Sequence, residues 1–172
     1  VIGASMAGLL AARALADIYE RVTIVERDEL PAGAEQRRAI PQGRHVHALL
    51  PRGQQELEML LPGITAELID AGAVTYEALS EMYFSVHGHP VARVAVNHGT
   101  ILASRPLIAA HARGRVRALP GVEIRDRCDV AGVATTADRR RVTGVRVLRR
   151  ADGSAEELLG AELVVDATGR GS

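Results

Sequence analysis

The chain has 172 residues, of which 47% are hydrophobic and 24% are charged, and its formal net charge at pH 7 is zero. This apolar content is sufficient for a folded domain, and the zero net charge gives no support for binding to nucleic acid or to an anionic membrane. No apolar run reaches the length of a membrane span, and a single cysteine excludes an internal disulfide framework. We therefore predict a cytoplasmic protein with no membrane span and no nucleic-acid partner.

The stretch Val1–Glu26 carries the most informative pattern in the sequence. It contains the end of a buried strand (residues 1–2), a turn of small residues (3–8), a segment of helical composition (9–18) and a second strand (22–25) that ends at an acid. This order of strand, turn, helix, strand and acid is that of a dinucleotide-binding βαβ unit.

Each special position in this stretch has a physical role. Gly3 permits a sharp exit from the strand, and Gly8 lets the helix pack closely against the sheet. The middle position, usually a glycine, is Ser5, whose hydroxyl could cap the helix or contact phosphate. The first N–H groups of the helix, at its positive dipole end, are expected to meet the phosphates.

Glu26 follows Gly8 by eighteen residues, close to the ~20 residues expected before a carboxylate that binds the adenosine ribose. A carboxylate at this place repels a 2′-phosphate, so the predicted nucleotide is FAD or NAD rather than NADP.

The remaining elements follow in chain order. We expect a loop over 27–43, helices over 44–60 (or starting at Pro51), 64–71 and 105–119, and strands over 83–86, 91–96 and 122–125, with a turn over 87–90. Three alternating segments, 129–135, 142–148 and 156–161, have turn signals between them at Asp138 and Asp152-Gly153, which predicts an antiparallel meander. Residues 163–166 have the composition of a buried parallel strand.

The predicted fold class is therefore α/β, a Rossmann-like parallel sheet with helices on both faces and an antiparallel β-meander as crossover. A plain NAD-binding domain would continue with further βα units after Glu26. The long insertion and the meander that stand there instead favour an FAD-binding fold.

With these motifs in hand, the chain resembles the FAD-binding region of the p-hydroxybenzoate hydroxylase-like flavoprotein monooxygenases. These proteins share the glutathione-reductase-type FAD fold with flavin-dependent halogenases and geranylgeranyl reductases. The stretches that carry the resemblance are Val1–Gly8 running to Val25-Glu26-Arg27, Pro41–Leu50 with Ser104–Leu107, and Leu163–Gly169.

The resemblance assigns cofactor contacts residue by residue. It implies that the turn lines the FAD pyrophosphate, through Gly3, Ala4, Ser5, Met6, Ala7 and Gly8. It implies that Glu26 holds the adenosine ribose, with Arg27 on the adenine side. It further implies cofactor contacts by Arg44 (or His45 or Arg38 in its place), Arg105, the backbone of Val130, and the closing turn Ala167, Thr168 and Gly169. A guanidinium near a diphosphate is also favourable on electrostatic grounds alone.

The function that the resemblance implies is an FAD-dependent oxidoreductase, in the first place a monooxygenase that hydroxylates a small organic or aromatic substrate with NAD(P)H and oxygen. A flavin-dependent halogenase, a prenyl-chain reductase and a non-catalytic dinucleotide-binding module remain open.

We expect residues 1–172 to be an FAD-binding domain that forms the N-terminal fragment of a longer protein and is inactive alone. Residues from about 73 to 103 are expected to begin an inserted substrate-side subdomain. No catalytic residue is assigned, because those residues are expected beyond Ser172, and the oligomeric state is open.

Other candidate sites are weaker. The histidine pairs His45 with His47 and His87 with His89 lack further ligands at suitable spacing, and Cys128 has no partner motif, so we predict no metal site. The arginine runs 139–141 and 149–150 have no aromatic platform beside them and are interpreted as solvated hairpin ends.

Overall fold

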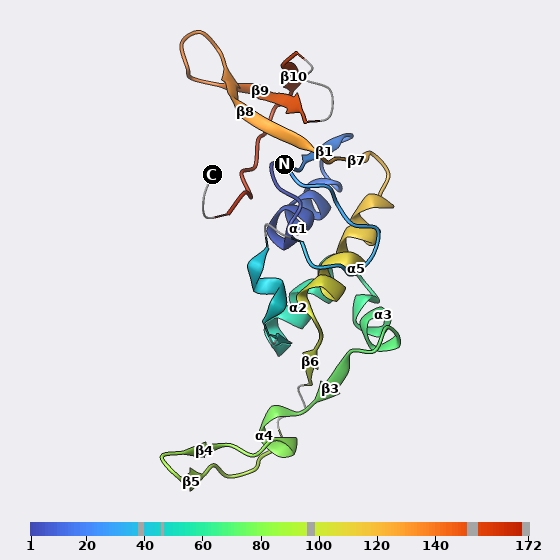
Figure 1. Cartoon of the computed structure of the whole chain (residues 1–172), viewed down its shortest axis with the longest axis vertical. Helices are drawn as coiled ribbons and strands as arrows, with labels where there is room; N and C mark the ends of the chain where they lie inside the picture. The colour runs from blue at the N-terminus through green and yellow to red at the C-terminus, as the bar shows by residue number, and fades with distance from the viewer. Residues whose placement is uncertain (38–39, 46, 96–98, 151–154, 170–172) are drawn as a thin grey trace. The chain divides into compact units, whose positions relative to one another are not determined.

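The structure, a computed structural model, describes residues 1–37, 40–45, 47–95, 99–150 and 155–169. The chain divides into two compact units, the first made of Val1–Gly33 with Ala112–Ser172 and the second of Ala34–His111 (Figure 1). The elements in chain order are α1 (Met6–Leu15), β1 (Val22–Val25), the 3₁₀ helix η1 (Pro41–Arg44), β2 (Ala48–Leu49), α2 (Pro51–Leu60), α3 (Ile64–Asp70), β3 (Val74–Tyr76), α4 (Ala78–Glu81), β4 (Ser85–Val86), β5 (His89–Pro90), β6 (Thr100–Leu102), α5 (Arg105–Arg117), β7 (Val122–Arg125), β8 (Cys128–Thr135), β9 (Val142–Arg149) and β10 (Glu157–Gly160).

A parallel sheet forms the centre of the first unit. β1 pairs in parallel with β7 on one side. On its other side lies Ile2, which forms parallel bridges to Val25 and to Asp166. Gly3 N donates to Val25 O at 2.7 Å and Ala167 N donates to Ile2 O at 2.9 Å, which extends the pairing to the carboxyl ends of these segments. Those ends therefore meet at one edge of the sheet.

The first helix and strand form as their residue types predict. β1 is a run of β-branched residues, which suit a strand, and Ile24 within it is fully buried. In α1, Leu9 and Ala12 lie one turn apart on the same face and are also fully buried. The helix begins at Met6, earlier than predicted, because the tight turn places the helical conformation directly after Ser5.

The predicted meander is confirmed. β8, β9 and β10 form an antiparallel sheet in the order β10-β9-β8, drawn in orange to red in Figure 1. Its apolar face packs on the parallel sheet through one buried cluster, formed by Ile2, Val25, Cys128, Val145 and Val147. The predicted α/β fold with a meander is therefore present. The predicted Asp152-Gly153 turn lies outside the described residues.

The second unit differs more from the sequence prediction. It contains a small antiparallel sheet, β2-β6-β3, that was not predicted, because strands of two or three residues are too short to show a period. The predicted helix over 44–60 begins at Pro51, the alternative start, and proline at the first helical position costs no hydrogen bond.

The predicted hairpin is present but shorter. His87 and Gly88 both have positive φ, which makes a two-residue turn and pairs Val86 with His89. The strand predicted over 91–96 is wrong for residues 91–95, which have no regular structure, because the turn is two residues shorter than expected and the returning strand occupies His89–Pro90. Residue 96 lies outside the described residues.

The prediction of a buried strand over 163–166 is partly wrong. This segment is parallel to its neighbour, but it forms a bridge only at Asp166, and Leu163 is 45% exposed. Within the described residues no further strand pairs with its outer side, whereas Val164 packs against the buried cluster. No helix in the described ranges combines the length and apolar content needed to cross a membrane.

Replacing a central apolar side chain tests the parallel sheet. Ile24→Ala is expected to lower the free energy of unfolding by about 2–5 kcal/mol, because it removes buried methyl groups and leaves a cavity. Urea denaturation measures this loss. Ile18→Ala is the matched control: Ile18 is 75% exposed, so its removal should change stability by no more than about 0.5 kcal/mol. Equal losses for both variants would contradict this description of the core.

Candidate functional site

The turn between the first strand and α1 requires glycine at both predicted positions. Gly3 has φ of +97°, which disfavours other residues, and a side chain there would come within 2.7 Å of the carbonyl oxygen of Ala167. A Cβ on Gly8 would overlap the carbonyl oxygen of Gly3. The start of α1 therefore packs directly on its own turn and on the segment that follows Asp166.

The N-terminus of α1 has no side-chain cap in the described part of the chain. Ser5 occupies the N-cap position with extended backbone, but its hydroxyl makes no capping bond, and the first turn contains no acid. Of the two roles expected for this hydroxyl, the helix cap is therefore wrong, and the contact with phosphate stays a prediction. The positive end of the helix dipole, with the backbone of Met6 and Ala7, is available to an anion at this point.

Glu26 joins the end of β1 to this turn. Its side chain is only 8% exposed. One carboxylate oxygen accepts a hydrogen bond from Ala4 N at 2.7 Å, and the other accepts one from Asp28 N at 2.9 Å. The carboxylate predicted to bind a ribose thus also holds the turn and the start of the next loop. The side chain of Ala4 is buried (1% exposed), so any cofactor contact by this residue is a backbone contact.

The closing turn after the sheet lies beside the first turn. Ala167 packs near Gly3 and Gly8, while Thr168 and Gly169 are exposed. Asp166 accepts hydrogen bonds from the hydroxyl of Thr168 at 2.6 Å and from its N–H at 3.0 Å. These two bonds hold the pKa of Asp166 below its ordinary value, and the bond from the hydroxyl has the larger effect.

The two residues predicted near adenine lie on neighbouring segments of the first unit. Arg27 is exposed and follows Glu26 directly. Val130 lies on β8, where its side chain packs against the buried cluster. Cys128 N donates to Glu26 O at 2.9 Å, so β8 begins beside the predicted ribose-binding acid. The predicted cofactor contacts of Arg27 and Val130 stay predictions.

Arg44 and Arg105 belong to the second unit. Arg44 ends η1 and Arg105 begins α5, and both are exposed. The pKa of His47 is lowered mainly by its partial burial and to a smaller extent by the positive charge of Arg105. His45, one alternative to Arg44, is also exposed, and Arg38, the other, lies outside the described residues. Their cofactor contacts stay predictions.

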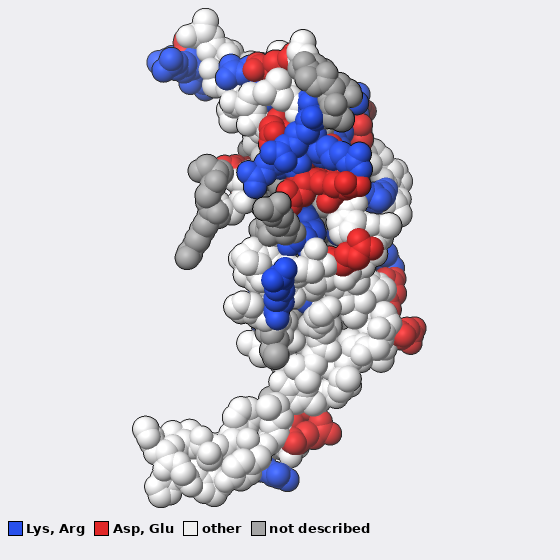
Figure 2. All heavy atoms as spheres, viewed as in Figure 1, with Lys and Arg blue, Asp and Glu red and all other residues white. Residues whose placement is uncertain are grey.

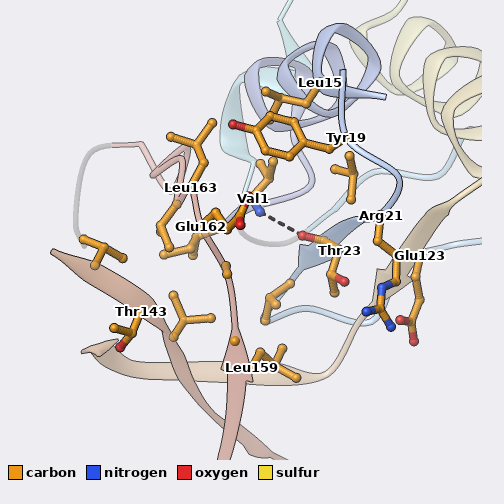
Figure 3. Close-up of a pocket in the computed structure, with 18 of the residues that line it drawn as sticks. Val1, Leu15, Tyr19, Arg21, Thr23, Glu123, Thr143, Leu159, Glu162 and Leu163 are labelled. Atoms are coloured by element: carbon orange, nitrogen blue, oxygen red, sulfur yellow. Dashed lines mark hydrogen bonds between the residues drawn. The ribbon is translucent and has the colours of Figure 1, made fainter. Parts of the chain in front are cut away.

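A cavity of about 1200 Å³ lies elsewhere in the first unit. Figure 3 shows its lining by the end of α1 (Leu15), the start of β1 (Thr23) and the meander (Thr143, Leu159). It therefore lies toward the amino end of β1. Ligands of such sheets bind outside the carboxyl ends of the strands, and the glycines of the turn do not line this cavity. It therefore lies away from the residues that the sequence predicts to bind a dinucleotide.

Several charged side chains of the first unit form ion pairs with one another. Figure 2 shows basic and acidic residues side by side on this unit, and the ion pairs include Arg125–Glu157, Arg146–Glu156 and Arg150–Asp129. Within the described residues, no group of three or more His, Cys, Asp and Glu side chains is arranged to hold a metal ion.

Sequence reasoning missed the residues that anchor the loop after Glu26. Asp126 accepts a hydrogen bond from Leu30 N, and Arg113 donates to the carbonyls of Pro31 and Gly33. No motif marks them, because their partners are backbone atoms 80 or more positions away in the sequence.

Comparison with known proteins adds to this geometry. No family model matches the chain. Protein Rv3254 of Mycobacterium tuberculosis is 39% identical over 183 residues, an alignment that spans 100% of this chain and 38% of Rv3254.

Solved structures show a similar fold. PqsL, a probable FAD-dependent monooxygenase from Pseudomonas aeruginosa, matches with a TM-score of 0.61 at 19% identity, over 89% of this chain and 38% of PqsL. The myxobacterial chondrochloren halogenase CndH, a variant of FAD-dependent halogenases, matches with a TM-score of 0.62 at 19% identity, over 93% of this chain and 34% of CndH. The chain therefore has the fold found in these FAD-dependent enzymes, and it spans little more than a third of their length.

The packing of the turn predicts opposite effects for two glycine substitutions. Gly8→Ala is expected to destabilise the protein, because its Cβ would overlap the carbonyl oxygen of Gly3. Gly114→Ala is expected to stabilise it by about 0.5–1 kcal/mol, because alanine is the better helix former and Gly114, within α5, has open space around its Cβ position. Thermal unfolding of the cofactor-free variants measures both. A Gly8→Ala variant as stable as wild type would contradict the packing described.

The closing turn predicts a pKa change. In Thr168→Val the hydroxyl donor is lost, so the pKa of Asp166 is expected to rise toward the ordinary aspartate value. Because the folded-state pKa is depressed, the two bonds stabilise the turn above the ordinary pKa and are lost as the pH falls through the depressed value. Carboxyl ¹³C NMR titration measures the shift, and an unchanged pKa in the variant would refute the stated cause.

Proposed function

We propose that this chain is the FAD-binding part of a flavoprotein oxidoreductase. The observation that carries the proposal is the cradle at the carboxyl end of the sheet. There the α1 N-terminus has no side-chain cap within the described chain. No side chain fits at Gly3 in the turn before it or at Gly8 in its own first turn, and the buried carboxylate of Glu26 is hydrogen-bonded to Ala4 N. The N–H donors of the helix suit a pyrophosphate, and the carboxylate acceptor suits a ribose hydroxyl.

Each group of the cradle has a binding role in the proposal. Backbone N–H groups at the start of α1 meet the two phosphates, and the small side chain of Ser5 lets the pyrophosphate approach. Glu26 accepts from a ribose hydroxyl while it keeps the turn in place. Arg27, the backbone of Val130 and the Ala167–Gly169 turn surround the adenosine half. The cofactor contacts of Arg44 and Arg105, which belong to the second unit, follow from the sequence resemblance alone.

The finer proposal is a monooxygenase that hydroxylates a small organic or aromatic substrate with NAD(P)H as reductant. FAD supplies the redox chemistry when bound, and the part of this chain is to bind and orient it. The fold shared with PqsL supports this reading, but the fold shared with CndH supports a halogenase on the same cradle as well. A prenyl-chain reductase has the same requirement for FAD.

The decisive experiment is an absorption spectrum of the purified protein, followed by heat release of its chromophore. Flavin bands and released FAD support the proposal, whereas a colourless protein that takes up NAD but not FAD refutes it. Oxidation of NAD(P)H with oxygen, faster with substrate, separates an enzyme from a non-catalytic dinucleotide-binding module. In the module, the cofactor binds without turnover.

A variant at the acid tests the cradle itself. Glu26→Gln is expected to raise the Kd for FAD by about tenfold or more, because an amide group cannot accept hydrogen bonds from both Ala4 N and Asp28 N and one donor loses its partner. Glu20→Gln is the matched control, since Glu20 is exposed and lies two residues before the amino end of β1. Fluorescence titration with FAD measures both, and equal affinities in the two variants would contradict the role of Glu26.

A further inference from the structure

The loop that follows Glu26, residues 27–33, is fixed to the first unit by its backbone. Asp28 N donates to the carboxylate of Glu26 at 2.9 Å. Two residues later, Leu30 N donates to Oδ2 of Asp126 at 2.8 Å, and the side chain of Leu30 is buried at 8% exposure. The backbone N–H of Arg127 donates in turn to Asp28 O at 3.3 Å. Alternate residues of the loop are thus held by groups from β1 and from the β7–β8 connection.

Arg113 holds the end of the same loop. This arginine lies on α5 and is only 4% exposed. Its Nη2 donates to the carbonyl oxygen of Pro31 at 2.7 Å and to that of Gly33 at 2.9 Å. A buried guanidinium is costly unless its donors are satisfied, and bonds from a charged donor are stronger than neutral ones. The buried guanidinium therefore holds the end of this loop through its two carbonyl oxygens.

The loop is anchored at the place where the adenosine half of the proposed nucleotide would bind. The loop leaves the carboxyl end of β1 directly after the acid proposed to hold the ribose, and bound nucleotides lie outside these strand ends. In an adenosine unit the base is attached to that ribose. The loop is therefore expected to face the base. It runs beside the start of β8, where Cys128 N donates to Glu26 O.

We propose that Arg113 and Asp126 are positioning residues that hold the loop Arg27–Gly33 as a preformed wall for the adenosine half of the dinucleotide. The inference rests on the proposed function, because it assumes that the nucleotide binds at this cradle. A preformed wall strengthens binding because the entropy of ordering the loop is lost on folding and not on association. The anchors touch the loop and not the nucleotide, so they act on affinity and not on chemistry.

Arg113→Met tests the wall, because methionine keeps an unbranched apolar stem and removes both hydrogen bonds. The Kd for FAD and the Kd for ADP, which lacks the flavin, are expected to rise by a similar factor of about ten. Amide exchange at Leu30 in the cofactor-free protein is expected to become faster. Arg117→Met is the matched control, the same substitution one turn further along α5 at an exposed position, and should leave all three quantities unchanged.

The outcomes separate this inference from the proposed function. Wild-type protein that binds neither FAD nor ADP refutes the proposed function and the wall with it. Wild-type protein that binds both, with unchanged ADP affinity in Arg113→Met, overturns the wall alone, and so does weaker FAD binding without weaker ADP binding. If Arg113→Met does not fold, Asp126→Ala removes the other anchor, which is only partly buried. The Kd values for FAD and for ADP are then expected to rise by a similar factor in that variant.

Discussion

The carboxylate of Glu26 is the contact on which the geometry of the cradle depends. It lies at the end of β1, yet one of its oxygens binds the N–H of Ala4 in the turn that precedes α1. A buried carboxylate is stable only when such donors satisfy it. The same bond fixes how far the turn lies from the strand end. The conformation of the turn, the start of α1 and the site proposed for the ribose are therefore set together.

Close packing of backbone on backbone supports this contact. Gly3, Gly8 and Ala167 meet where a larger side chain at either glycine would overlap a carbonyl group. Small residues at this point allow the first turn and the turn after Asp166 to lie side by side, although more than 150 residues separate them in the sequence. The helix N-terminus is thereby held at the edge of the sheet, where its positive end is most useful to an anion.

The two ends of the sheet have different roles. The carboxyl end carries the cradle, whereas the amino end borders the cavity lined by Leu15, Thr143 and Leu159. Between these two ends, the meander packs on the parallel sheet through the buried cluster that includes Val145 and Val147. Arginine is used in two ways in this unit: in ion pairs such as Arg150–Asp129, and, at Arg113, as a buried anchor for a loop.

The sequence predicted those parts of the fold that depend on local rules. Glycines in a short turn, a strand of β-branched residues and alternating segments leave patterns that are readable over a few residues, and these located α1, β1 and the meander. The short strands β2, β3 and β6 left no such pattern, because their pairing is decided by partners far along the chain. The turn predicted over 87–90 is two residues too long, since the positive φ angles that confine it to His87 and Gly88 are not visible in composition.

By itself, the sequence determined the α/β class, the turn of small residues before α1 and the acid at the end of β1, because each depends on residue type and spacing. Only the tertiary structure decided that Ser5 leaves the helix uncapped, that Glu26 bonds to Ala4, and that Arg113 and Asp126 hold the loop after β1. The physical reason is the same in each case. A hydrogen bond from a side chain to a distant backbone atom depends on where the chain returns in space, and nothing in the local sequence records that return.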